Sequence, residues 1–224
     1  NPDFNIPHTS AIVHGKLDLP TNCAAFDISL GCSGFVYTLS VLEGFMTRNA
    51  FQTALLFTAD PYSKIVSQED RSTAMLFGDG AAVTLLSSNP KLISLKYTFG
   101  TIGKQYDKLI CRDGVLTMNG RGIFDFAARN IPKDVKKLLE INDLDKDDID
   151  LFLMHQGSKY IVETLTRRLK LSSEKVPFLA SNVGNTVSST IPILLEKYIN
   201  DNNYQKIAIT GFGVGLSWAS TILK

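Results

Sequence analysis

The sequence lacks long apolar runs, a disulfide pattern and a strong net charge. No apolar stretch in its 224 residues is long enough to span a bilayer, which argues against a transmembrane protein. The three cysteines, Cys23, Cys32 and Cys111, match neither a disulfide framework nor a metal site. We therefore expect a reducing, cytoplasmic compartment. A net charge of +1 gives no overall attraction to nucleic acid or to a membrane surface.

Apolar runs of strand length alternate along the chain with segments of helical periodicity. Strands are expected at residues 24–28, 53–59, 75–77, 81–86, 92–99, 149–154, 178–181, 206–210 and 216–223. Helices are expected at residues 9–16 (capped by Thr9 or Ser10), 33–46, 123–141, 158–171 and 186–199. Residues 78–80 are expected to form a glycine turn between two strands, and residues 63–73 and 100–114 to be irregular. This alternation predicts an α/β fold in which helices pack against a mixed sheet.

A cysteine lies at the turn between a predicted strand and a predicted helix. Cys32 stands just before the helix at residues 33–46, where unpaired N–H groups and the helix dipole stabilise a thiolate, the nucleophilic form. Gly31 and Gly34 leave space for a substrate to approach the sulfur. Cys32 is therefore a candidate nucleophile; the alternative is a buried cysteine that acts as a small hydrophobic residue.

Two segments of the chain resemble each other. The run FQTALL at residues 51–56 is similar to YQKIAI at residues 204–209, and the same offset places Cys32 opposite Asn185. The repeat predicts two halves related by a pseudo-two-fold axis, with two helix N-termini facing a shared site; chance similarity is the alternative. The strand at residues 149–154 has no counterpart in the first copy, so we expect an N-terminal segment of the full protein to be absent.

Other polar residues stand where a site would form. His155 follows a predicted strand, at the carboxyl end where open α/β sheets place their sites. Asn185 precedes a predicted helix and could simply cap it. The glycine-rich run at residues 211–215 offers backbone N–H groups to an oxyanion. Together with Cys32, these residues supply the parts for acyl transfer through a thioester.

Five segments together resemble the β-ketoacyl-acyl carrier protein synthase III family, a branch of the thiolase-like condensing enzymes. They are DISLGCSGF at 27–35, LFGDGA at 76–81, HQ at 155–156, GNT at 184–186 and GFGVGLSW at 211–218. The resemblance spans the chain in the family's order and implies a thiolase-like fold, a homodimer and the absence of roughly the first eighty family residues. The halves would be residues 1–114, which hold Cys32, and residues 115–224.

The resemblance also implies a mechanism, a decarboxylative Claisen condensation of an acyl-CoA with malonyl-acyl carrier protein, without a cofactor. Cys32 would take the acyl group, while His155 and Asn185 would hold the enolate that forms when the malonyl group loses carbon dioxide. The backbone N–H groups of Cys32 and Val214 would form the oxyanion hole.

Peripheral roles follow from the same resemblance. Arg71, Phe124 and Arg121 match positions that contact the coenzyme A substrate or its tunnel, although a solvated arginine or a core phenylalanine would look the same. Arg167 and Arg168 match a basic patch that receives the acidic carrier protein, but paired arginines on a helix are also common on a solvated face.

The chain departs from the family pattern at several positions, and this leaves alternatives open. Gly157, Ser158 and Tyr160 replace common family residues after His155, Val214 replaces a frequent glycine, and Arg121 stands where asparagine is common. Such changes suit a specialised member as well as one that initiates fatty acid synthesis. The alternatives are acyl transfer to an amine or hydroxyl without decarboxylation, and an idle partner subunit; the intact Cys32, His155 and Asn185 argue against the latter.

Overall fold

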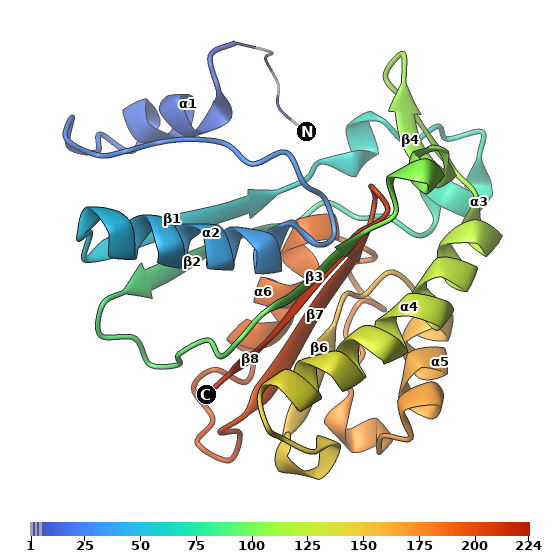
Figure 1. Ribbon diagram of the computed structural model, residues 1–224. Helices are drawn as coiled ribbons and strands as arrows, with labels where there is room; N and C mark the ends of the chain where they lie inside the picture. The colour runs from blue at the N-terminus through green and yellow to red at the C-terminus, as the bar shows by residue number, and fades with distance from the viewer. Residues whose placement is uncertain (1, 3, 5) are drawn as a thin grey trace.

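The computed structural model describes residues 2, 4 and 6–224 (Figure 1). Its α-helices are α1 (Thr9–Lys16), α2 (Gly34–Asn49), α3 (Arg71–Ala74), α4 (Gly120–Ile141), α5 (Lys159–Leu169) and α6 (Thr190–Glu196). Its strands are β1 (Thr53–Ala59), β2 (Ala81–Ser87), β3 (Thr98–Thr101), β4 (Leu109–Arg112), β5 (Val115–Met118), β6 (Leu151–Met154), β7 (Ile207–Gly213) and β8 (Ser217–Leu223). Short 3-10 turns are η1 (Tyr62–Lys64), η2 (Gly103–Lys108), η3 (Lys146–Asp148), η4 (Ser173–Lys175) and η5 (Val187–Ser189).

Two sheets enclose a layer of helices. The antiparallel pair β1–β2 forms one sheet, and β3-β8-β7-β6 forms the other, in which β6 and β7 run parallel and the remaining pairs antiparallel. The helices α2 and α6 pack between these sheets, while α4 and α5 cover the other side of the larger sheet (Figure 1). Every residue of β6 and β7 is buried, as expected for strands covered on both faces. The predicted α/β layers around a mixed sheet are confirmed.

The predicted repeat is visible in the topology. The helix α2 leads into β1, which pairs antiparallel with β2, and α6 leads into β7, which pairs antiparallel with β8. Cys32 precedes the first of these helices and Asn185 the turn that opens the second. The two half-sites therefore meet in the central helix layer.

The two faces of the β1–β2 sheet differ. Leu56 and Thr58 point inward and are buried, whereas Leu55 and Phe57 are exposed. Their cross-strand partners on the same face, listed with their exposed fractions, are Leu85 (64%) and Val83 (57%). The outward face of this sheet is therefore apolar and open to solvent.

The expectation of a strand at residues 24–28 is wrong. These residues are mostly exposed and form no ladder, because no strand among the described residues lies beside them to pair with. Asp27 instead accepts hydrogen bonds from the backbone N–H groups of Thr9 (2.7 Å) and Ser10 (2.8 Å). The cap of α1 is thus a distant carboxylate and not the side chain of Thr9 or Ser10 as expected.

Other boundaries also differ from expectation. Of residues 75–77, only Phe77 forms a bridge, and its partner is Asn185, so the glycines that follow make no hairpin. Of the expected strand at 92–99 only residues 98 and 99 belong to β3, which continues to Thr101. Residues 178–181 form no strand, and the stretch at 100–114, expected to be irregular, contains the end of β3, η2 and β4. The expected helix at 186–199 is split into η5 and α6. In each case tertiary hydrogen bonding decides what local periodicity left ambiguous.

Candidate active site

Cys32 is buried at the start of α2, with 2% of its surface exposed. Its sulfur lies against the turn between β7 and β8, where a Cβ atom built on Gly213 would stand 2.7 Å from Sγ. A Cβ on Gly211 would stand 2.7 Å from the Cys32 carbonyl oxygen. Only glycine permits this approach, because a Cβ atom at either position would overlap Cys32. The glycine run that the sequence analysis singled out therefore forms one wall of the cysteine's site.

Burial raises the pKa of the Cys32 thiol to about 12. The backbone N–H of Val214 and that of Cys32 itself counteract this by stabilising the thiolate, while the nearby Asp60 carboxylate raises the pKa further. Cys32 is thus a thiol at neutral pH. The backbone N–H groups stabilise the thiolate as expected, but desolvation, which the sequence did not reveal, outweighs them.

Cysteine alkylation is expected to report this burial. In the native protein at about pH 7.5, iodoacetamide should modify the exposed Cys23 and Cys111 at least about tenfold faster than Cys32. Peptide mass spectrometry over time measures the three rates separately, and the denatured protein serves as the control in which they converge. If Cys32 reacts as fast as Cys111 in the native protein, Cys32 is not buried as the structure has it.

His155 follows β6 at its carboxyl end and is 3% exposed. Its backbone N–H donates to the carbonyl of Thr210 (2.9 Å), and its ring meets the ring of Phe212 edge-on at 5.5 Å. The Nδ1 atom lies 2.8 Å from the Thr190 hydroxyl, which donates to the carbonyl oxygen of Val187 (3.0 Å). Because a hydroxyl has one proton, Nδ1 carries the ring proton while Thr190 donates to Val187; the neutral ring carries its proton on Nε2 when the hydroxyl turns to donate to Nδ1.

Burial lowers the pKa of His155 to about 3, although a hydrogen bond to the backbone of Val187 opposes the shift. The ring is therefore neutral at physiological pH. Since the ordinary pKa is 6.5, the unfolded chain binds a proton below that pH while the folded chain does not until about pH 3.

The free energy of unfolding is accordingly expected to decrease as the pH is lowered, because His155 takes up a proton in the unfolded chain before it does so in the folded one. Between about pH 6 and 4, this residue should lower the free energy of unfolding by up to about 1.4 kcal/mol per pH unit. Urea unfolding of the native protein and of His155→Asn at several pH values measures the difference in slope. Equal slopes in the two proteins would show that His155 is accessible to protons in the folded state.

Asn185 is held by its backbone and by its side-chain oxygen. Its N–H donates to the carbonyl of Leu76 (2.7 Å), and its carbonyl accepts from the N–H of Gly78 (3.0 Å). Its Oδ1 accepts from the N–H of Val187 (2.9 Å), which orients the amide so that Nδ2 is the free donor. Thr186 is the N-cap residue of η5, so Asn185 does not cap this turn as the alternative supposed; its Oδ1 holds the first N–H of the turn, and Nδ2 is left as a donor.

The structure brings the three predicted side chains together. Phe212 and Gly213 are adjacent, the first against His155 and the second against Cys32. Val187, whose N–H holds Asn185, has a methyl group 3.4 Å from a Cβ built on Gly31. Among the residues that the structure describes, neither His155 Nε2 nor Asn185 Nδ2 makes a hydrogen bond, so both remain available to a ligand.

Two neighbours of Cys32 were missed by the sequence analysis. Tyr62 is buried with its hydroxyl 3.5 Å from a Cβ built on Gly31, and burial raises the pKa of this phenol, with the charges of Cys32 and Asp60 adding to the shift. Asp60 follows β1 and accepts hydrogen bonds from the backbone N–H (3.2 Å) and the hydroxyl of Ser188. The rule that led to His155, a polar residue directly after a buried strand, would also have found Asp60.

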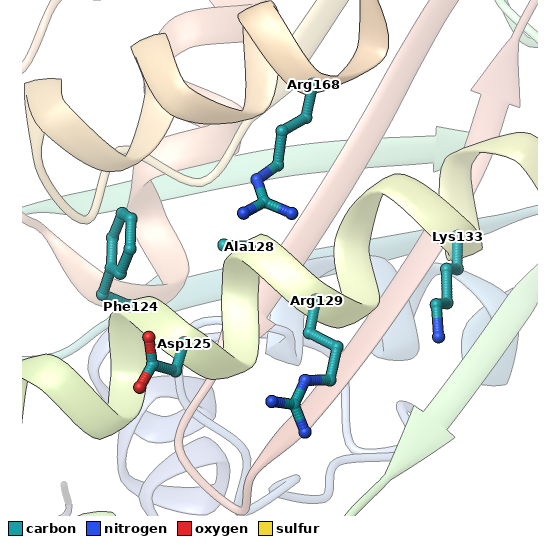
Figure 2. A pocket seen from close by; sticks show the side chains of 6 residues that line it. All are labelled: Phe124, Asp125, Ala128, Arg129, Lys133 and Arg168. Carbon is teal, nitrogen blue, oxygen red and sulfur yellow. The ribbon is translucent and has the colours of Figure 1, made fainter.

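The remaining predicted residues lie on the surface or in a shallow pocket. Arg71 begins α3 and Arg121 lies in the first turn of α4, both exposed. Arg167 is exposed and donates to the Thr164 hydroxyl (3.1 Å). A pocket of about 350 Å³ between α4 and α5, shown in Figure 2, is lined by Phe124, Asp125, Ala128, Arg129, Lys133 and Arg168. Cys32 does not line it, so these residues and the buried cluster are separate features.

Phe124 is half-buried in that pocket, and its ring stacks on that of Tyr160 at 5.1 Å. Arg168 reaches from α5 toward α4, as Figure 2 shows. Among residues 2, 4 and 6–224, no three histidine, cysteine or acidic side chains gather as a metal site requires. In the same part of the chain, no helix is both long and apolar enough to cross a bilayer.

Comparisons with known proteins agree with this geometry. The sequence model described as 3-oxoacyl-[acyl-carrier-protein (ACP)] synthase III matches residues 26–103, and that of the same synthase's C terminal matches residues 139–224. The β-ketoacyl-[acyl-carrier-protein] synthase III of Lactococcus lactis subsp. cremoris is 35% identical over 243 residues, covering 100% of this chain and 74% of the relative. That of Streptococcus agalactiae is 36% identical over 242 residues, covering 100% and 74%.

A solved structure of the same synthase is also similar to this chain. The crystal structure of 3-oxoacyl-[acyl-carrier-protein] synthase III from Aquifex aeolicus matches with a TM-score of 0.93 at 31% identity, covering 100% of this chain and 74% of that one. The likeness covers both sheets and the helix layer between them.

Proposed function

Because the chain belongs to the 3-oxoacyl-[acyl-carrier-protein] synthase III family, we propose that it condenses an acyl-CoA with malonyl-acyl carrier protein through an acyl-cysteine intermediate. One observation carries the proposal most directly. The buried Cys32 lies against Gly213, the neutral His155 against the adjacent Phe212, and Val187, which orients the Asn185 amide, lies beside Gly31 next to Cys32. This set supplies a nucleophile and two hydrogen-bond donors but no charged base, which suits a reaction in which decarboxylation generates the carbanion.

In the first step, Cys32 attacks the carbonyl carbon of the acyl-CoA. The new bond joins Sγ to the acyl carbon, the bond from that carbon to the coenzyme A sulfur breaks, and the thiol proton of Cys32 passes to the departing sulfur. Since burial raises the pKa of Cys32 to about 12, the resting group is the thiol, and its proton has to be given up for the carbon–sulfur bond to form. The N–H groups of Val214 and Cys32, which stabilise negative charge at Sγ, are the proposed donors to the oxyanion.

In the second step, the malonyl thioester loses carbon dioxide, and the electron pair of the broken carbon–carbon bond forms an enolate. We assign its oxygen to His155 Nε2 and Asn185 Nδ2. The low pKa of His155 keeps the ring neutral, and the proposal requires the Thr190 hydroxyl to turn from the Val187 carbonyl and donate to Nδ1, which places the ring proton on Nε2. The enolate carbon then attacks the acyl-cysteine carbonyl, and Cys32 leaves as the thiolate and regains a proton.

The surface residues complete the proposal. Arg167 and Arg168 on α5 are exposed cations, which suits an acidic carrier protein, and Arg71, Arg121 and Phe124 are assigned to the coenzyme A substrate. A homodimer, a cytoplasmic location, the absence of a cofactor and the division into residues 1–114 and 115–224 remain predictions. The strand β3 belongs to the first of these parts and β8 to the second, yet the two strands pair in one sheet.

The direct test uses purified protein, an acyl-CoA panel and malonyl-acyl carrier protein labelled at its free carboxylate. Release of labelled carbon dioxide that depends on prior acylation of Cys32, together with a 3-oxoacyl-carrier product, is the expected result. Acylation without carbon dioxide release would favour transfer to an amine or hydroxyl. No acylation by any donor would favour an idle partner subunit.

A further inference from the structure

The segment Leu76–Gly80 carries no group that the proposed mechanism uses, yet it makes both backbone hydrogen bonds of Asn185. It forms a short parallel bridge in which Asn185 donates to the Leu76 carbonyl at 2.7 Å and accepts from the Gly78 N–H at 3.0 Å. Both hydrogen bonds involve the backbone of Asn185 itself. The position of its Cα atom is therefore set by this segment.

Glycines make this approach possible. A Cβ atom on Gly78 would lie 1.9 Å from the carbonyl oxygen of Val183, a backbone atom that no side-chain rotation can move. Opposite it, Gly184 has a φ of +70°, and its Cβ would lie 3.0 Å from the Gly78 nitrogen. A Cβ on Gly80 would lie 2.8 Å from the Thr186 side chain. The two backbones thus touch where a residue with any side chain would separate them.

The far side of the same turn is anchored to the same half of the chain. The Ser189 hydroxyl lies 2.9 Å from the Thr58 hydroxyl and 3.1 Å from the Gly80 carbonyl oxygen. Ser188 donates to the Asp60 carboxylate through its backbone N–H (3.2 Å) and its hydroxyl. The turn from Asn185 to Ser189 is therefore fixed at both ends by residues near β1 and β2. The helix that leads into β1 is α2, which begins beside Cys32.

We infer that Gly78, supported by Gly80, is a positioning residue that sets the Asn185 amide relative to Cys32. The inference rests on the proposed function of Asn185, and it identifies the segment that holds Asn185 in place. Because the nucleophile and Gly78 lie in one half and Asn185 in the other, the Gly78–Gly184 contact fixes the relation between the two half-sites. A displacement of about 1 Å in such a site costs about a hundredfold in rate.

The test is Gly78→Ala, with Gly44→Ala as the matched control. Gly44 is exposed in α2, and a Cβ there would meet no atom within 4 Å. We expect Gly78→Ala to acylate Cys32 within about threefold of the native rate and to release carbon dioxide about a hundredfold more slowly. The control should retain both rates. A merely structural role would lower the two steps together, and that result, or an unchanged carbon dioxide rate, would overturn the inference.

Two further measurements keep the inference open to refutation. If Gly78→Ala lacks the native circular dichroism, Ser189→Ala replaces it; this variant should lose roughly fivefold in carbon dioxide release alone, and no loss would refute the inference. If the native protein itself releases no carbon dioxide, the proposed function fails and the crystal structure of Gly78→Ala decides. A displaced Asn185 without its 2.9 Å contact to Val187 would support the inference, and an unmoved Asn185 would refute it.

Discussion

A Cys32→Ala variant is expected to take up no acyl group from any acyl-CoA and to lose condensation by at least about a thousandfold. The reason is that the acyl carbon has no other thiol to join in the buried cluster: among the described residues, Cys23 and Cys111 are both exposed. The intact mass of the protein after incubation with each thioester measures the effect, because one acyl group adds a defined mass.

Cys111→Ala is the matched control for this variant. It removes an exposed thiol and should leave the mass gain unchanged. A full mass gain in Cys32→Ala would show that another residue carries the acyl group, and would contradict the assignment of Cys32 as the nucleophile. Since alanine fills less space than cysteine in a buried site, circular dichroism of the variant establishes that the fold is retained.

His155→Ala and Asn185→Ala are each expected to slow carbon dioxide release by about a hundred- to a thousandfold, the usual effect of removing one donor to a developing oxyanion. Acylation of Cys32 should persist in both, because neither side chain is assigned to that step. Labelled malonyl-acyl carrier protein reports the decarboxylation, and intact mass reports the acylation in the same sample.

The double variant distinguishes a shared role from two separate ones. If both donors hold the same oxygen, removing them together should cost less than the product of the two single effects. His8→Ala and Asn89→Ala, at exposed positions, serve as controls. Equal losses in acylation and decarboxylation would instead assign these residues to the structure of the site as a whole.

Local rules located the candidate site but not its environment. Cys32, His155 and Asn185 were found because each stands at a strand end or a helix start, and such positions follow from periodicity. The pKa of Cys32 could not be predicted in this way, since it depends on burial by the β7–β8 turn, which is more than 170 residues away in the sequence.

The same distinction explains the fold. The helix α4 and the strand β1 have strong patterns of their own and were predicted within a few residues. Residues 24–28 have an equally apolar pattern, but no strand in the described part of the chain pairs with them. Residues 75–77 look like a strand locally because the bridge from Phe77 to Asn185 cannot be seen in the sequence. Asp60 could have been found by the rule that led to His155, but its contact with Ser188, which comes from the other half of the chain, could not.

The alternation along β1 and β2 separates the solution behaviour of the protein from its chemistry. Leu55 and Leu85 face each other across the outward side, as do Phe57 and Val83, while the side chains that point inward from the same strands support the η5 turn. A lysine and a glutamate in place of the Leu55–Leu85 pair would form a cross-strand ion pair on a surface that is otherwise apolar and exposed. The outward face carries none of the residues assigned to the active site, so these substitutions are expected to change how this chain associates in solution and not its chemistry.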